Sequence, residues 1–327
     1  MVDLQSMISS NNRLSSVKGP NVALFVGATS GIGLGVLKQF AQHAAEPRVY
    51  FVARNAATAA PIADELRELN PRGKYEIIEK NVSLVKDAAK VAEVVKSKES
   101  SLDLLFMSVG FFSMDGRQDT SEGLDASMTT RYYSRTRITQ ALLPLLNESR
   151  SPRVVNILAG GREGPIDEDD LSLDKPKSFS VPTSMAHCAT MMTLSMEHMA
   201  SENPRISFAH QFPGLVATPL FYRISSGIRG MVIRYLVAPV VGLFARDINE
   251  AGQRGLFTAT SARYSVDNGV VPLAAGMEKA EKTKGGIFLL NENGDSINNE
   301  KVLADFRKRG VDKKIWAHAQ EVFARIR

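Results

Sequence analysis

The feature that most constrains the fold is a regular series of short apolar runs separated by longer segments with helical spacing. The runs span residues 22–26, 49–53, 75–78, 102–107, 153–158, 206–212 and 287–290. Continuous apolar strands that alternate with helices indicate a parallel sheet buried on both faces. No Gly/Ser/Pro-rich linker divides the series. The sequence therefore predicts one α/β domain over residues 1–327, with a doubly wound parallel sheet of about seven strands.

The composition excludes several classes of protein and partner. Of 327 residues, 44% are apolar and 23% charged, which excludes disordered and collagen-like chains. Forty Lys and Arg stand against 35 Asp and Glu, a net charge of +5, and the basic residues are scattered. We therefore expect no nucleic-acid partner. The single cysteine, Cys188, cannot form an internal disulfide or a multi-cysteine metal site, so we expect a reducing compartment and no metal.

The N-terminal residues 1–18 form a polar extension without the apolar core of a secretory signal. Leu4, Met7, Ile8 and Leu14 have the spacing of a short amphipathic helix laid against the body of the protein. No uninterrupted apolar run reaches the roughly 18 residues that a membrane-spanning helix needs. The sequence thus predicts a cytoplasmic protein with no spanning segment.

A glycine-rich loop follows the first strand and precedes a helix predicted over residues 34–45. Gly27 permits the tight turn, Gly31 lets backbone approach a pyrophosphate, and Gly33 lets the helix pack closely on the strand. The helix N-terminus supplies N–H donors to an anion. This context favours a bound dinucleotide over a turn without a ligand. The predicted contacts are Gly27, Thr29, Ser30, Gly31, Ile32 and Gly33.

The end of the second strand indicates which nicotinamide cofactor is bound. An acidic residue there would hydrogen-bond the ribose 2′-OH of NAD, but this chain has Ala53 followed by Arg54. The guanidinium of Arg54 suits a 2′-phosphate, so NADP(H) is the predicted cofactor. The alternative is that Arg54 is only a solvated cation.

The G-x-x-x-G-x-G spacing of the loop resembles the short-chain dehydrogenase/reductase family, and the resemblance runs over about residues 22–306. It includes an Asn-Val pair after the third strand, Ser-Val-Gly after the fourth, where the family has Asn-Ala-Gly, and Pro-Gly-x-Val-x-Thr after the sixth. It implies a Rossmann-type fold and further cofactor contacts. These are Asn81, Val82, Gly110, Pro213, Gly214, Val216 and Thr218.

The family's catalytic residues are missing. Members have an Asn, a Ser and a Tyr-x-x-x-Lys pair, and those positions fall on Arg131, Ala159, Thr183 and His187. Hydride delivery to a carbonyl leaves an oxygen that must be protonated or stabilised by donors. Ala159 cannot donate, and the hydroxyl of Thr183 is too basic to replace an activated phenol.

Other side chains near these positions are candidates for the lost functions. His187 can act as acid or base near neutral pH, and it shares a helix face with Thr183 and nearly so with Ser184. Tyr132 and Tyr133 lie beside Arg131 and are candidates for a replacement phenol. For each the alternative stays open: a buried structural histidine, a paired or solvated arginine, and tyrosines packed in the core.

The segment after the sixth strand is long and apolar. Residues 219–246 occupy the place where the family has a lid over the substrate, so we predict an apolar helical lid. An apolar lid suits a bulky hydrophobic substrate. A subunit interface in a homo-oligomer and a contact with a membrane surface are the alternatives.

Two functional hypotheses follow. Residues 203–208, 212–214 and 262–264 resemble a fungal branch of the family that is associated with polyketide and terpenoid pathways. This resemblance implies an atypical reductase of a bulky hydrophobic carbonyl compound that uses NADPH. The loss of the catalytic residues supports the alternative, a non-redox cyclase, isomerase or dehydratase on the same scaffold. Nothing positive supports a catalytically silent binding protein.

Overall fold

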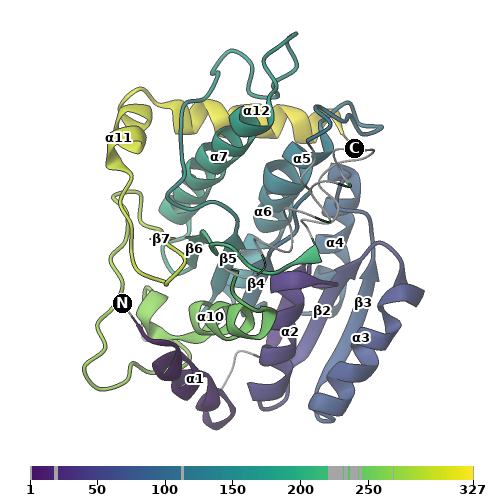
Figure 1. The fold of residues 1–327 in the computed structure, drawn as a ribbon, viewed down its shortest axis with the longest axis vertical. Helices are drawn as coiled ribbons and strands as arrows, with labels where there is room; N and C mark the ends of the chain where they lie inside the picture. The colour runs from purple at the N-terminus through teal and green to yellow at the C-terminus, as the bar shows by residue number, and fades with distance from the viewer. Residues whose placement is uncertain are drawn as a thin grey trace.

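The computed structural model describes residues 2–17, 21–111, 114–219, 231, 235, 242, 245–267 and 269–326. Within this part of the chain, parallel strands form a seven-stranded sheet of order β3-β2-β1-β4-β5-β6-β7 (Figure 1). The strands are β1 Val22–Val26, β2 Arg48–Ala53, β3 Lys74–Glu79, β4 Leu104–Met107, β5 Arg153–Ile157, β6 Ser207–Gln211 and β7 Phe288–Leu290. The predicted doubly wound α/β sheet is confirmed, because each apolar run overlaps one of these strands.

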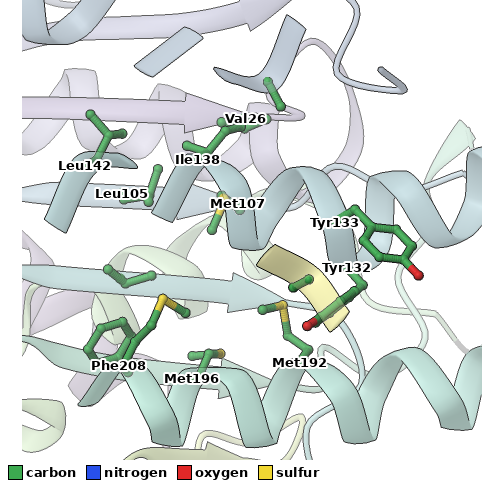
Figure 2. Close-up of a cluster of buried hydrophobic side chains, with 14 of the residues drawn as sticks. Val26, Leu105, Met107, Tyr132, Tyr133, Ile138, Leu142, Met192, Met196 and Phe208 are labelled. Carbon is green, nitrogen blue, oxygen red and sulfur yellow. The ribbon is translucent and has the colours of Figure 1, made fainter. Parts of the chain in front are cut away.

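Helices cover both faces of the sheet and bury two apolar cores. One core lies between the sheet and α4, α6, α7 and α12, and Figure 2 shows part of it, with Met107 of β4 near Met192 and Met196 of α7. The other lies between the sheet and α2, α3 and α10. The helices are α1 Leu4–Asn12, α2 Gly31–His43, α3 Ala56–Leu69, α4 Val85–Lys98, α5 Ala126–Met128, α6 Ser134–Asn147, α7 Val181–Glu202, α10 Ile248–Thr260, α11 Glu300–Lys308 and α12 Val311–Arg325.

The N-terminal extension forms the short helix α1, which lies against α10 (Figure 1). Asp3 caps this helix by accepting a hydrogen bond from the backbone N–H of Ser6, at 2.9 Å. The side-chain amide of Asn11 donates to the backbone oxygen of Gln253 on α10, at 2.9 Å, and Met7 is buried in the second core. The extension is thus part of the packed body.

The predicted lid over residues 219–246 lies largely outside the described residues. Pro219, Met231, Tyr235, Gly242, Ala245 and Arg246 are described. Over the described ranges, no helix is both long enough and apolar enough to cross a membrane.

Candidate active site

The carboxyl ends of β1 and β4 meet the start of α2 with no room for a side chain. Gly27 has a φ of +88°, and a Cβ there would lie 2.3 Å from the backbone nitrogen of Val109. A Cβ on Gly33 would lie 2.3 Å from Oγ of Ser108 and 2.4 Å from the carbonyl oxygen of Gly27. Ser108 Oγ donates to that same carbonyl oxygen, at 3.0 Å. Both glycines are therefore required by the close approach of three elements.

Helix α2 begins at Gly31, earlier than predicted, so Gly31 and Gly33 belong to its first turn. Ser30 is the N-cap residue, but its side chain makes no capping hydrogen bond. Thr29 and Ser30 are exposed. The first turn of α2 therefore has no side-chain cap, and an uncapped helix start is the arrangement that binds a phosphate.

The glycine loop and the loop after β6, two of the predicted contact regions, lie together. A Cβ on Gly31 would lie 3.1 Å from Cγ2 of Thr218, so Thr218 rests directly on the first turn of α2. Val216 is buried and forms a β-bridge with Arg246. We call this arrangement of the glycine loop and residues 213–218 the cradle. A shallow recess beside it is lined by Ile32, Pro213, Gln211, Ile157, Arg246, Arg254 and Glu292 among others.

The remaining predicted cofactor residues follow β3 and β4. Gly110 is exposed, and no described atom lies within 4 Å of the position its Cβ would take. Val82 is buried, and its carbonyl oxygen accepts a hydrogen bond from Ser134 Oγ, at 2.7 Å. Asn81 is half-buried and accepts from the backbone N–H of Ser83, at 3.2 Å. Gly110 thus borders open space next to the cradle, which a bound molecule can fill.

Arg54 follows the carboxyl end of β2 and is exposed. Within the described ranges its guanidinium has no recorded hydrogen bond or ion pair. The next residue, Asn55, caps α3 by accepting from the backbone N–H of Thr58, at 3.0 Å. The uncapped start of α2, the close-packed glycines and an uncommitted guanidinium together fit a phosphorylated dinucleotide.

The hydroxyls predicted near the catalytic position serve the first turn of α7. Thr183 is exposed, and its Oγ1 lies 2.6 Å from Oγ of Ser180, the N-cap residue. Ser184 is buried and donates to the carbonyl oxygen of Val181, at 3.0 Å. Both side chains stabilise the start of the helix, which leaves neither as an evident proton donor.

His187 is fully buried one turn further along α7. Its Nε2 lies 3.1 Å from the carbonyl oxygen of Leu171, which can only accept, so Nε2 carries the proton. In the neutral ring Nδ1 is then an acceptor, and it is buried without a hydrogen-bond partner among the described residues. Burial lowers the pKa of His187. The ring is therefore placed to accept a hydrogen bond and poorly suited to donate a proton.

Tyr132 and Tyr133 are fully buried in the first core, where Figure 2 shows the Tyr132 ring directed toward Met192. The Tyr132 hydroxyl lies 2.9 Å from Ser195 Oγ, and the Tyr133 hydroxyl lies 2.9 Å from Nε2 of His318. Burial raises the pKa of both phenols. This placement speaks against either tyrosine as a replacement proton donor.

Arg131 shares a π-helical turn, Thr129–Tyr133, with both tyrosines. It is buried, and burial lowers its pKa, while the nearby carboxylate of Asp125 acts in the opposite direction. Such wide turns occur often at functional positions of helices. Its burial makes the solvated-cation interpretation wrong for Arg131.

A buried chain of hydrogen bonds behind Ala159 was not predicted from the sequence. His210 on β6 is fully buried, with Nε2 3.2 Å from the backbone nitrogen of Ala159 and Nδ1 2.8 Å from Oγ1 of Thr193. Thr193 Oγ1 donates to Oε1 of Glu163, at 2.7 Å, and the Asn299 amide donates to Oε2, at 2.9 Å. A histidine inside the apolar run 206–212 was the signal that could have revealed it.

A buried arginine at the ends of β4 and β5 was also missed. Arg135 on α6 donates to the carbonyl oxygens of Met107 and Ile157, at 3.2 and 3.1 Å. It also donates to Oδ1 of Asn156, at 3.2 Å, and to the carbonyl oxygen of Val109. Burial lowers its pKa to about 9. Its spacing of four residues from Arg131 places both on one helix face, which was the signal in the sequence.

The acidic run 167–170 is a paired surface loop. Glu168 pairs with Arg309, and Asp169 lies 3.3 Å from Lys314. Asp170 accepts from the backbone N–H groups of Asp174 and Lys175. In the part of the chain that the structure describes, no group of His, Cys, Asp and Glu side chains could hold a metal ion.

Known proteins resemble this chain over nearly its whole length. A family model for short chain dehydrogenases matches residues 21–165. The NmrA-like family domain-containing oxidoreductase notO of Aspergillus sp. (strain MF297-2) is 45% identical over 326 residues, which cover 99% of this chain and 96% of that protein. The short-chain dehydrogenase/reductase SAT2 of Stachybotrys chartarum is 30% identical over 320 residues, covering 91% and 90% of the two chains.

Solved structures share the fold. A short-chain dehydrogenase from Sphingobium yanoikuyae, in complex with NADPH, superposes with a TM-score of 0.52 at 18% identity, covering 73% of this chain and 83% of that one. The sequence relatives and the geometry of the cradle agree with this shared fold. The chain belongs to the short-chain dehydrogenase/reductase family, and the relatives it matches over nearly its whole length are named as oxidoreductases or dehydrogenases.

Proposed function

We propose that the protein is an NADP(H)-dependent oxidoreductase that acts on a bulky apolar carbonyl compound. The observation that carries the proposal is the contact of Thr218 with Gly31 beside the uncapped start of α2, because it assembles both ends of a dinucleotide cradle. When bound, the nicotinamide cofactor would supply or accept the hydride. The protein supplies binding, orientation and exclusion of water.

The cofactor would be held by residues that follow the carboxyl ends of five strands, β1, β2, β3, β4 and β6. The N–H groups at the start of α2 would bind the pyrophosphate, and the exposed guanidinium of Arg54 would pair with the 2′-phosphate. Asn81 and Val82 border the adenine. The open space at Gly110 admits the ribose, and residues 213–218 contact the nicotinamide end.

Three exposed apolar side chains support the proposed class of substrate. Met114 follows β4, Met185 lies near the start of α7, and Leu215 follows β6, and their exposed fractions are 54%, 42% and 52%. All three segments adjoin the carboxyl edge of the sheet. Large apolar side chains exposed at a cofactor site favour a hydrophobic substrate, since its binding removes them from water. A polyketide- or terpenoid-like carbonyl compound fits this chemistry.

His187 is the residue we assign to a hydroxyl of the ligand. It stands at the position of the family's lysine, and its Nδ1 is an acceptor with no hydrogen-bond partner among the described residues. Because the ring is fully buried, a hydroxyl of the ribose or of the substrate would reach this acceptor only if the side chains that cover it move. Thr183 and Ser184 act on the same helix turn as capping residues.

Calorimetric titration with NADPH and NADH tests the proposal. The unmodified protein should bind NADPH more tightly than NADH, and Arg54→Ala should weaken NADPH binding about tenfold while changing NADH binding little, since a charge-assisted pair to phosphate is lost. Arg72→Ala is the matched control. Arg72 is also an exposed arginine, but it lies in the loop before β3, at the amino ends of the strands, whereas Arg54 lies at the carboxyl ends. It should leave both affinities unchanged.

Two outcomes would contradict the proposal. Absence of heat with either nucleotide would remove the cofactor from the function. Conversion of a hydrophobic carbonyl compound to a product of identical mass would replace the oxidoreductase by an isomerase or cyclase.

A further inference from the structure

A fully buried guanidinium lies where the carboxyl ends of β4 and β5 meet. Arg135 donates to the carbonyl oxygens of Met107 and Ile157, the last residues of these strands. The other acceptors recorded for its guanidinium are Asn156 Oδ1 and the carbonyl oxygens of Val109 and Thr130. All are neutral oxygens. Among the described residues, then, no carboxylate forms an ion pair with this cation.

The charged neighbours of Arg135 do not cancel its charge. Arg131, one turn earlier, adds a second positive charge that disfavours protonation of Arg135. Asp125 acts on Arg131, and its two oxygens accept backbone N–H groups of Met128 and Gln118. The thiol of Cys188 stays neutral because burial raises its pKa to about 12. The potential at the ends of β4 and β5 is therefore positive.

This charge lies at the base of the cradle. The Val109 carbonyl that Arg135 binds belongs to the residue whose backbone nitrogen lies against Gly27, and Gly110 follows it at the open space. The guanidinium thus lies beneath the carboxyl ends of β4 and β5. The proposed function places the cofactor on the outer side of these same strand ends.

We propose that Arg135 determines which redox form of the cofactor the protein prefers, favouring NADPH over NADP⁺. This inference rests on the proposed function. The nicotinamide ring is positively charged when oxidised and neutral when reduced, so a fixed buried cation opposes the oxidised form alone. Two unit charges about 10 Å apart at an effective dielectric of about 20 change an equilibrium constant about tenfold. A tenfold preference for the reduced form raises the reduction potential of the bound cofactor by about 30 mV, so bound NADPH is the weaker reductant and bound NADP⁺ the stronger oxidant.

The experiment measures the dissociation constants of NADPH and NADP⁺ by calorimetry and takes their ratio. Two variants cancel the positive charge in different ways. Arg135→Met deletes the cation, whereas Asn156→Asp keeps Arg135 and places a carboxylate at the Oδ1 that already accepts from it, at 3.2 Å. Each should reduce the preference for NADPH about tenfold. The second variant gives the answer if the first fails to fold, because it pairs the buried cation instead of removing it.

Arg153→Met is the matched control. Arg153 is also fully buried and donates to carbonyl oxygens, those of Thr258 and Ser261, but it begins β5, at the opposite end of that strand from Ile157. Its loss should lower stability and leave the affinity ratio unchanged. A merely structural role of Arg135 would make the two arginine variants alike.

The possible outcomes distinguish a failure of the role proposed for Arg135 from a failure of the proposed function. If the unmodified protein binds neither nucleotide, the proposed function fails and this inference with it. If it binds both and Asn156→Asp leaves the ratio unchanged, only the role of Arg135 is overturned. An equal shift of the ratio in Arg153→Met also overturns it.

Discussion

Nε2 of His210 accepts a hydrogen bond from the backbone N–H of Ala159, at 3.2 Å. A peptide N–H can only donate, so Nε2 carries no proton and Nδ1 must carry it. Nδ1–H then donates to Thr193 Oγ1, which leaves the Thr193 hydroxyl to donate to Glu163. One backbone contact thus sets the direction of each hydrogen bond that links Ala159, His210, Thr193 and Glu163. The residue at the family's serine position is held through its backbone by a neutral histidine.

His210 should make the protein sensitive to acid. Burial lowers its pKa from 6.5 to about 3, so below pH 6.5 the unfolded chain binds a proton that the folded chain does not. The stability that depends on the neutral ring is present above pH 6.5 and is lost as pH falls toward about 3. Between pH 7 and pH 5 the loss should be about 2 kcal/mol. Urea unfolding at both pH values measures it.

The control is a second histidine on a neighbouring element. His210→Gln should reduce the difference between pH 7 and pH 5, and His198→Gln, at a half-buried site beside Trp316, should leave most of it. Nitrogen chemical shifts should show the Nδ1–H tautomer of His210 from pH 5 to pH 8. Titration of this ring within that range would contradict the assigned hydrogen-bond directions.

Alanine at two glycines should separate packing from ligand binding. Gly33→Ala gains roughly 1 kcal/mol of helix propensity but places Cβ against Ser108 and the Gly27 carbonyl, so we expect a net destabilisation of about 2 kcal/mol. Gly110→Ala meets only open space and should leave the melting temperature unchanged while weakening NADPH binding about tenfold. Thermal melts and calorimetry measure both.

The predictions for the two glycine variants can be contradicted independently of each other. A Gly33→Ala protein with the original stability would mean that α2 shifts away from β1 and β4 at little cost. Unchanged NADPH affinity in Gly110→Ala would mean that the cofactor does not pass this residue.

Removing the hydroxyl groups of the two buried tyrosines should lower the stability of the protein and leave its turnover nearly unchanged. Tyr133→Phe loses the bonds to His318 and Ser172, and Tyr132→Phe loses the bond to Ser195, so each should cost about 1 kcal/mol of unfolding free energy. Turnover should stay within a few-fold of the original. His187→Ala is the comparison variant and should lower turnover at least tenfold. A hundredfold loss of turnover in a folded tyrosine variant would return that phenol to the mechanism.

The strand series and the glycine loop could be predicted because they depend on local rules. Apolar runs of strand length alternate with helical spacing, and each predicted run overlaps a strand. The start of α2 was placed late, since glycine disfavours helix interiors and the prediction treated Gly31 to Gly33 as loop. Only the packing of α2 against Gly27 and Ser108 makes glycine the residue that the first turn requires.

The polar residues near the catalytic positions could not be placed from sequence, since burial and hydrogen-bond partners depend on segments far apart in the chain. Tyr133 meets His318, 185 positions away, and Arg135 meets Ile157 at the end of another strand. The sequence alone determined the fold, the family and the position of the glycine loop, because these follow from local periodicity and spacing. Only the tertiary structure decided which ionisable groups are buried, and hence that His187 is an acceptor and that Arg135 has no carboxylate partner among the described residues.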